Sequence, residues 1–459
     1  MVGLRAVHWL LIAFCAAAAV GYVHGLVSAT GVVRIDLYQY WGVGQVIRET
    51  DGAVRNPYLE SHAFDRELAR FAQQSDEPVV REAHTVRPEL ELQATPVAYT
   101  LFSYLPSSYV RTQYLYSLGQ LALFAGALAL LLRRTGIPSR PALLFGLLLV
   151  PMYIPLRAEL RVANYNTLLL FGIALAFHWI HRIPVTATAG AGLADDDDDD
   201  QKEHPVSASR YAAAAIGLLG SLVLLKPTVV PIALGLLACC IARLGPAPML
   251  RPLLWGGTAI AAVACWPMVR LGSAGIWLEW VEYFQTGNLA MLELPWAKGN
   301  RSTVLFLSTL TGAPLAAVTI ALGAALASGY SIILRGAPAP VAAARKALCD
   351  PTLALSLGVV GLLALSPLAW QHYYVLLLAG AIPLLRVGAG PERVPLLAGT
   401  SLLLAAVVPI QLLLSPLASA NEFLGRGLPH AIHLGLMLSW VPLWLANLSA
   451  LTASLRSAR

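Results

Sequence analysis

Long apolar stretches recur along the whole chain and alternate with short polar segments. A helix needs about 20 consecutive apolar residues to cross a bilayer. On this criterion hydropathy predicts about twelve transmembrane helices, at residues 7–28, 112–132, 141–156, 162–180, 211–225, 228–243, 253–270, 313–334, 352–366, 370–385, 394–414 and 429–448. Several contain proline, which membrane helices tolerate where the break faces protein or a water-filled cavity. The pattern predicts an all-α polytopic membrane protein with a single domain over residues 1–459.

Composition excludes several other classes of protein. Of the 459 residues, 57% are hydrophobic and only 12% are charged, roughly half the charged fraction of a soluble protein. So few charges cannot cover a soluble surface, which excludes a soluble enzyme, a secreted disulfide scaffold and a β-barrel. The first apolar run resembles a signal peptide but is too long and has no clear cleavage site, so we expect an uncleaved span.

The distribution of basic residues predicts an orientation. The formal net charge is +6, but no stretch forms the concentrated basic patch of a nucleic-acid-binding protein. Arginines instead gather in alternate loops, for example at 133–134, 243–251 and 335–346. Cytoplasmic loops carry an excess of Lys and Arg. We therefore expect a multi-pass protein of the plasma (inner) membrane with the segments 29–111 and 271–302 on the extracytoplasmic side.

Two hydrophilic segments differ in character. Segment 29–111, the large first extracytoplasmic loop, mixes aromatic, apolar and charged residues and is expected to fold into short amphipathic helices lying on the membrane. Segment 183–209 contains six consecutive aspartates, Asp195 to Asp200. Such a run repels itself and indicates a disordered cytoplasmic linker. The alternative, a metal-binding aspartate motif, would need spaced ligands on a rigid loop.

Ionisable residues at the predicted extracytoplasmic ends of the spans are the first candidates for chemistry. One such cation alone is explained by snorkelling to the headgroups. Several at one depth, each beside a helix break, favour a functional site because charges at membrane depth are costly. A phosphate among them would form charge-assisted hydrogen bonds. The candidate phosphate-binding residues are Arg157, Arg161, Lys226, Lys298, Arg301 and His372.

Asp36 is the acidic residue that we single out as a candidate for catalysis. It follows the first predicted span and precedes Tyr38 and Tyr40, which suit an interfacial anchor or a surface for stacking a sugar. It could simply cap the next helix. Facing a phosphate-binding cluster, its carboxylate could instead take the proton of an acceptor hydroxyl that attacks a sugar carbon, while the cations stabilise the departing phosphate. A base opposite the leaving group implies inversion of the anomeric centre.

The order of several short motifs resembles that of a known family. Asp36 lies in RIDLYQYW, and the chain continues with ANYN at 163–166, LKP at 225–227, NRS at 300–302 and SPLAWQHYY at 366–374. An acidic residue after the first span and a later Ser-Pro-x-x-Trp-x-His signature, in this order, resemble glycosyltransferase family 87. These GT-C fold enzymes include polyprenyl-phosphate-mannose-dependent mannosyltransferases and related arabinofuranosyltransferases.

The resemblance implies a GT-C type fold and an activity. A sugar, mannose or another hexose, would pass from a polyprenyl-phosphate donor to a glycolipid or glycan acceptor on the extracytoplasmic side. By position Asp36 would be the general base. Lys226, His372 and Arg301 would contact the donor phosphate, and Asn166 would help to shape the cavity. No cofactor is required, although a weakly bound divalent metal ion is compatible with such a site.

Several questions stay open at the level of the sequence. Ala163-Asn164 stands where the family has Gly-Gln, and Arg301 stands where it has Gln. The first extracytoplasmic loop is long and charged and could recognise a different acceptor, and the sequence fixes neither the acceptor nor the sugar. A flippase or transporter of a lipid-linked sugar would share the phosphate site without needing a base, and a non-catalytic scaffold would need neither. Glu159 could hold Arg157 or Arg161 in place. The further residues expected at the substrate cavity are Tyr38, Tyr40, Glu159, Asn166, Trp370 and Tyr373.

Overall fold

Helices make up the regular structure. The computed structural model describes residues 12–13, 16–17, 20–21, 33–185, 205–292, 300–337, 339–386, 392–405 and 434–456. Within these ranges every regular element is a helix, and an isolated β-bridge joins Asn300 to Trp370. The prediction of an all-α protein is confirmed. The acidic run of segment 183–209, most of the predicted span 7–28 and Lys298 lie outside the described residues.

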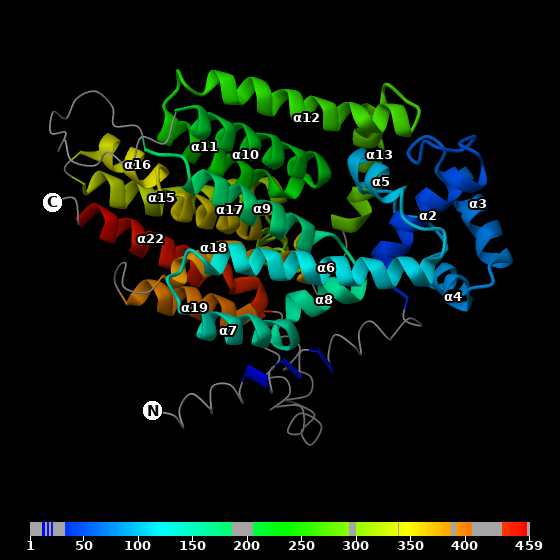
Figure 1. Ribbon diagram of the computed structural model, residues 1–459, viewed down its shortest axis with the longest axis horizontal. Coiled ribbons are helices and arrows are strands. Elements are labelled where there is room, and N and C mark those ends of the chain that lie inside the picture. Colours follow the sequence, from blue (N-terminus) through cyan, green and yellow to red (C-terminus); the bar gives the residue numbers. More distant parts are fainter. Residues whose placement is uncertain are drawn as a thin grey trace.

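Apolar helices form the body of the molecule. Six helices in the described ranges are long and apolar enough to cross a membrane, or up to eight if two bent pairs each count as one span. The chain is therefore a polytopic membrane protein, while the number twelve stays a prediction. Helix α10 packs along α12, and α9 (Asn166–His181) packs between α6 and α10 (Figure 1). The six candidate spans are α6 (Tyr109–Leu132), α10 (Pro205–Leu225), Pro227–Leu244 with α11 (Val230–Leu244), α12 (Leu250–Arg270), α15 (Leu315–Arg335) and Leu434–Arg456 with α22 (Trp440–Arg456).

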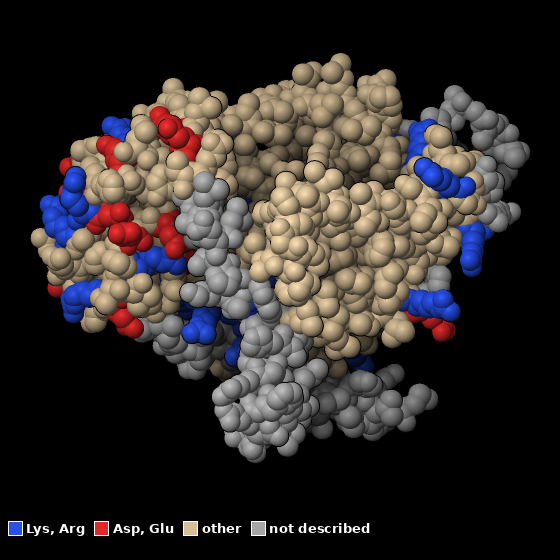
Figure 2. Space-filling view, turned by 180° about the vertical axis from the view of Figure 1, so that it is seen from behind, with Lys and Arg blue, Asp and Glu red and all other residues tan. Residues whose placement is uncertain are grey.

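The surface has the charge pattern of a membrane-spanning protein. Figure 2 shows a broad band without Lys, Arg, Asp or Glu between two charged ends. Acidic and basic side chains are mixed at one end. The opposite end, where α15 and α22 finish with Arg335 and Arg456, shows mainly basic ones. An apolar band between charged ends is the surface that a bilayer requires.

The predicted large loop forms a small helical region at the mixed-charge end (Figure 1). Its α3 and α4 are amphipathic and bury one face. The first helix, α2, differs from the expectation. Instead of lying on the membrane it is buried from Leu37 to Ile47, because Trp41 packs against Phe71 and Tyr109. The helices of this region are α2 (Ile35–Glu49), α3 (Ser61–Gln74), α4 (Pro78–Val86) and α5 (Pro96–Phe102).

A sharp bend replaces one predicted turn. The helix α7 (Ser139–Met152) ends before Tyr153, and α8 (Ile154–Val162) continues after this residue at an angle of 53°. The predicted spans 141–156 and 162–180 leave residues 157–161 as a short turn between them. This prediction is wrong, since these residues are helical. Helix α8 ends at Ala163, whose φ of 56° is left-handed, and this residue turns the chain into α9.

The segment around Pro367 is also irregular. Helix α17 (Pro351–Leu365) stops before Ser366-Pro367, and the predicted span 370–385 consists of three short pieces: η4 (Gln371–Leu376), α18 (Leu377–Ala381) and η5 (Ile382–Leu385). The predicted loop 271–302 contains a helix, α13. The remaining helices are η2 (Pro227–Val229), α13 (Ile276–Leu292), α14 (Thr303–Thr311), α16 (Pro340–Leu348) and α19 (Arg393–Ala405).

Candidate active site

A cavity of about 530 Å³ opens where the small helical region meets the long helices. It is bordered by the start of α2, the turn between α8 and α9, the break between α10 and η2, and the irregular segments at 300–302 and 366–373. Of the residues singled out in the sequence, the cavity wall contains Asp36, Tyr40, Lys226, Arg301, Trp370, His372 and Tyr373.

Asp36 lies in the first turn of α2, on the cavity wall. Arg34 occupies the N-cap, so the alternative that Asp36 caps the helix is wrong. The amide Nδ2 of Asn164 donates a hydrogen bond of 2.8 Å to its Oδ2. Burial raises the pKa of the Asp36 carboxyl above its ordinary value, and the bond from Asn164 and the charge of Lys226 partly offset this shift. A carboxylate with a raised pKa is a stronger base.

Hydrogen bonds hold both the backbone and the side chain of Asn164 in place. The hydroxyl of Tyr116 donates to its carbonyl oxygen at 2.9 Å, and Gln120 donates to the same oxygen. The left-handed residue Ala163 directly before it directs the side chain toward α2. Its Nδ2 donates to Asp36, while its Oδ1 accepts from Lys226 Nζ at 3.0 Å. One amide therefore joins the candidate base to the candidate phosphate-binding cation.

Lys226 occupies the break between two candidate spans. Its backbone is extended, and Pro227 starts η2 directly after it, so the side chain leaves a point where the helix is interrupted. Nζ donates to Asn164 and also to Asn166 Oδ1 at 2.8 Å, and it lies 4.0 Å from the centre of the Tyr373 ring. Only 7% of the residue is exposed. An ammonium has three donors, and the two asparagines use two of them.

Glu159 lies behind this cation, outside the cavity lining. Its carboxylate accepts from the backbone N–H of Asn166 at 2.6 Å, from that residue's Nδ2 at 2.8 Å and from Thr167 N at 3.3 Å. It therefore binds the N-terminus of α9, where a negative charge is favoured. Because Asn166 Oδ1 in turn accepts from Lys226, a continuous chain of hydrogen bonds runs from Glu159 to Asp36.

The part of the wall formed by Arg301 and residues 368–373 is held by a backbone assembly centred on Asn300. Its Oδ1 accepts from Ala369 N at 2.9 Å and from Ser302 N at 3.1 Å, and its Nδ2 donates to the Pro367 carbonyl at 3.0 Å. Arg301 N donates to Ala369 O at 2.7 Å. Two segments that are distant in the sequence are thus joined, and this assembly places Arg301 and His372 on one wall of the cavity.

His372 carries an unsatisfied group. The residue is 8% exposed, and its Nε2 is buried without a hydrogen-bond partner among the residues that the structure describes. Buried polar atoms are nearly always hydrogen-bonded in native proteins. An imidazole on the wall of a cavity with an unpaired nitrogen is a candidate contact for a ligand.

Several residues predicted for the site lie elsewhere. Arg157 and Arg161 occupy the exposed side of α8 and do not line the cavity. Tyr38 is fully buried between Trp41 and Tyr109, so it offers no surface to a sugar. Asn166 lies, like Glu159, behind the wall, where it positions Lys226.

Other lining residues were not singled out in the sequence. Asn164 was noted only as a departure from a motif. Six polar residues come from the small helical region, where polar residues are common and no motif distinguishes them: Gln39, Arg87, Glu91, Gln93, Thr95 and Tyr99. Arg87 forms an ion pair with Glu91. No protein family, curated protein or solved structure matches the chain.

Proposed function

We propose that the protein is an integral membrane glycosyltransferase that moves a sugar, mannose or another hexose, from a polyprenyl-phosphate donor to a glycolipid or glycan acceptor. The observation that supports this most is the pairing of Asp36 and Lys226 through Asn164 on the wall of one cavity. A base and a cation at opposite ends of one amide suit a reaction that removes a proton and releases a phosphate. The site would face the extracytoplasmic side.

In the proposed reaction the acceptor hydroxyl lies against Asp36. As its oxygen bonds to the anomeric carbon, the carboxylate takes the hydroxyl proton. The bond from that carbon to the phosphate oxygen breaks, and its electron pair leaves with the phosphate. The phosphate thereby gains one negative charge, which Lys226, Arg301 and His372 are placed to stabilise. The products are an inverted glycoside and polyprenyl phosphate.

The apolar part of the cavity suits a lipid-linked donor. Trp280 and Phe284 of α13 and Leu368 line it beside the polar groups. Trp280 is fixed by a hydrogen bond from its Nε1 to the Gln93 carbonyl at 3.2 Å. A polyprenyl chain could leave the phosphate site along these side chains, whereas a soluble nucleotide sugar would find few polar partners there.

Purified protein in liposomes would test the proposal. A radiolabelled polyprenyl-phosphate hexose is supplied on one side together with a glycolipid extract. A transferase should release polyprenyl phosphate and label the acceptor. A flippase should move the intact donor across the bilayer without breaking the ester, and this result would contradict the proposed function.

Asn164→Ala should change the pH dependence of transfer. The hydrogen bond from Asn164 favours the charged form of Asp36, so its loss should raise the Asp36 pKa further. The base is active when ionised. The acidic limb of kcat/KM should therefore move to higher pH, and activity should be lost first under mildly acidic conditions. Asn447→Ala removes a buried asparagine of α22 that bonds Leu353 and Tyr330, and it should leave the pH profile unchanged.

His372→Phe should weaken donor binding. A hydrogen bond to a charged group contributes about 1.5–3 kcal/mol, so KM for the donor should rise about tenfold or more, while His372→Gln should retain part of the affinity. His62→Phe, on the exposed side of α3, serves as the control. An unchanged KM in His372→Phe would exclude a contact between this imidazole and the donor.

A further inference from the structure

A second cavity, of about 410 Å³, lies at the C-terminal end of α2, whereas the candidate active site lies at the N-terminal end of this helix. We call it the arginine pocket. Its lining contains three arginines from separate places in the chain and, in the part that the structure describes, a single acidic residue: the full set is Ile47, Arg48, Asp51, Gly52, Arg55 and Arg270. None of these residues lines the candidate active site.

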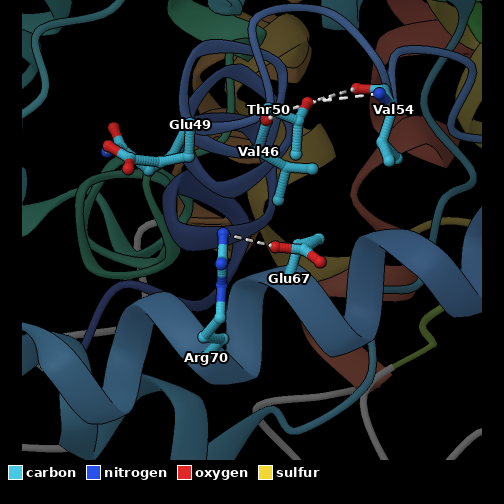
Figure 3. A network of polar contacts seen from close by, with 7 residues as sticks. Val46, Glu49, Thr50, Val54, Glu67 and Arg70 are labelled. Atoms are coloured by element: carbon cyan, nitrogen blue, oxygen red, sulfur yellow. Dashed lines mark hydrogen bonds and ion pairs between the residues drawn. The ribbon is translucent and has the colours of Figure 1, made fainter.

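The turn that forms one side of the pocket is firmly held. Thr50 Oγ1 donates to the Val46 carbonyl at 2.9 Å and accepts from Val54 N at 3.2 Å (Figure 3). Asp51 and Gly52 follow in left-handed conformations, with φ of 48° and 74°. The tight turn brings the chain back toward the end of α2 and places Arg55 at the pocket.

Two of the arginines are anchored to one serine. Arg48 Nη1 donates to the Ser103 carbonyl at 3.1 Å and to the Leu105 carbonyl at 2.8 Å, while Arg270 Nε donates to Ser103 Oγ at 3.0 Å. Their guanidinium groups are therefore held close together although they repel each other. Burial lowers the pKa of Arg48, and the charge of Arg270 lowers it further. An anion between them would relieve this repulsion.

The pocket lies at the end of a candidate membrane span. Arg270 is the last residue of α12. Its guanidinium is 5.0 Å from the centre of the Tyr104 ring, which stacks on Trp266 of the same helix at 5.9 Å. Tyr104 is 60% exposed and Val269 is 80% exposed. Exposed aromatic rings at the end of a span are typical of the headgroup level.

We propose that the arginine pocket binds a phosphate group, carried either by an anionic lipid headgroup or by a soluble anion. Guanidinium groups bind phosphate oxygens in pairs of parallel hydrogen bonds. The stem of the Arg55 side chain lies against Gly272, where a Cβ atom would come within 2.6 Å of Arg55 Cδ. This site does not depend on the proposed transfer reaction.

Binding to the purified full-length protein in neutral detergent tests the proposal. The probes are phosphatidylglycerol, monogalactosyl diacylglycerol, which has no phosphate, and inorganic phosphate. Phosphatidylglycerol should bind and raise the unfolding temperature, and the galactolipid should not. Arg55→Gln and Arg270→Gln should each weaken phosphate-dependent binding about tenfold. Arg66→Gln, an exposed residue of α3, should have no effect.

Asp51→Asn provides a test in the opposite direction. It removes the acid from the pocket, and asparagine tolerates the left-handed backbone, so phosphatidylglycerol should bind several-fold more tightly. If inorganic phosphate binds as well as the lipid, with the same dependence on Arg55 and Arg270, the ligand is a soluble anion. If neither probe binds, or if the arginine variants bind as the wild type does, the proposal is wrong.

Discussion

Asp36→Asn should lower sugar transfer about a hundredfold to ten-thousandfold, the usual contribution of a general base, while donor binding stays nearly unchanged. Asparagine has the shape of aspartate, and its carbonyl oxygen can still accept the hydrogen bond from Asn164. The cation cluster around Lys226 is not altered. Only the ability to take a proton from the acceptor is lost, so kcat should fall and KM for the donor should stay the same.

Glu89→Gln is the matched control for this prediction, because Glu89 is an exposed acid of the same helical region and does not line the cavity. It should transfer sugar at the wild-type rate. Full transfer in Asp36→Asn would exclude Asp36 as the general base. Loss of both donor binding and transfer would instead indicate that Asp36 supports the architecture of the cavity.

The sequence predicts the long helices well. The predicted spans 112–132, 253–270 and 313–334 have nearly the same first and last residues as α6, α12 and α15, respectively. A helix surrounded by lipid must be apolar over its whole length, so its ends are marked by the first polar residues. The signal is strong because the bilayer is a uniform solvent.

Hydropathy fails at α8 for a related reason. Arg157, Glu159 and Arg161 lower the apolar score of this stretch, which therefore resembles a turn. In the structure Arg157 and Arg161 share the exposed side of a helix, since residues four apart lie above one another. Glu159, two positions from each, faces the other way and is buried. Only the tertiary contacts distinguish a half-buried polar helix from a loop.

The sequence predicts those residues of the candidate site that are ionisable and lie next to a break in an apolar helix. Lys226 beside Pro227 and His372 after Pro367 are conspicuous in an apolar chain, and both reach one cavity with Asp36. Asn164 could not be recognised as a site residue in the sequence, because a neutral amide beside a turn has no distinctive pattern. Its role depends on the left-handed backbone at Ala163, which the sequence alone does not indicate.

Lys226→Met should affect both stability and transfer. The loss of the ammonium leaves the buried carboxyl of Glu159, which accepts hydrogen bonds from Asn166 and Thr167, without the cation that reaches it through Asn166. Removing one of two interacting buried charged groups is strongly destabilising, so the unfolding temperature should fall. Transfer should fall by a factor of about 10²–10³, the effect of removing one group that stabilises transition-state charge. Lys346→Met, at an exposed position in α16, should change neither.

Adding Glu159→Gln to Lys226→Met separates the two effects. A glutamine oxygen can still accept from Asn166 N, and the uncompensated buried charge is gone, so a large part of the stability should return. Transfer should not return, because no cation faces the departing phosphate. If the double variant regains both stability and transfer, Lys226 acts only by supporting the fold around Asn164 and Asn166. If it regains stability alone, the ammonium itself stabilises the leaving group, as the chain of hydrogen bonds from Glu159 to Asp36 leads us to expect.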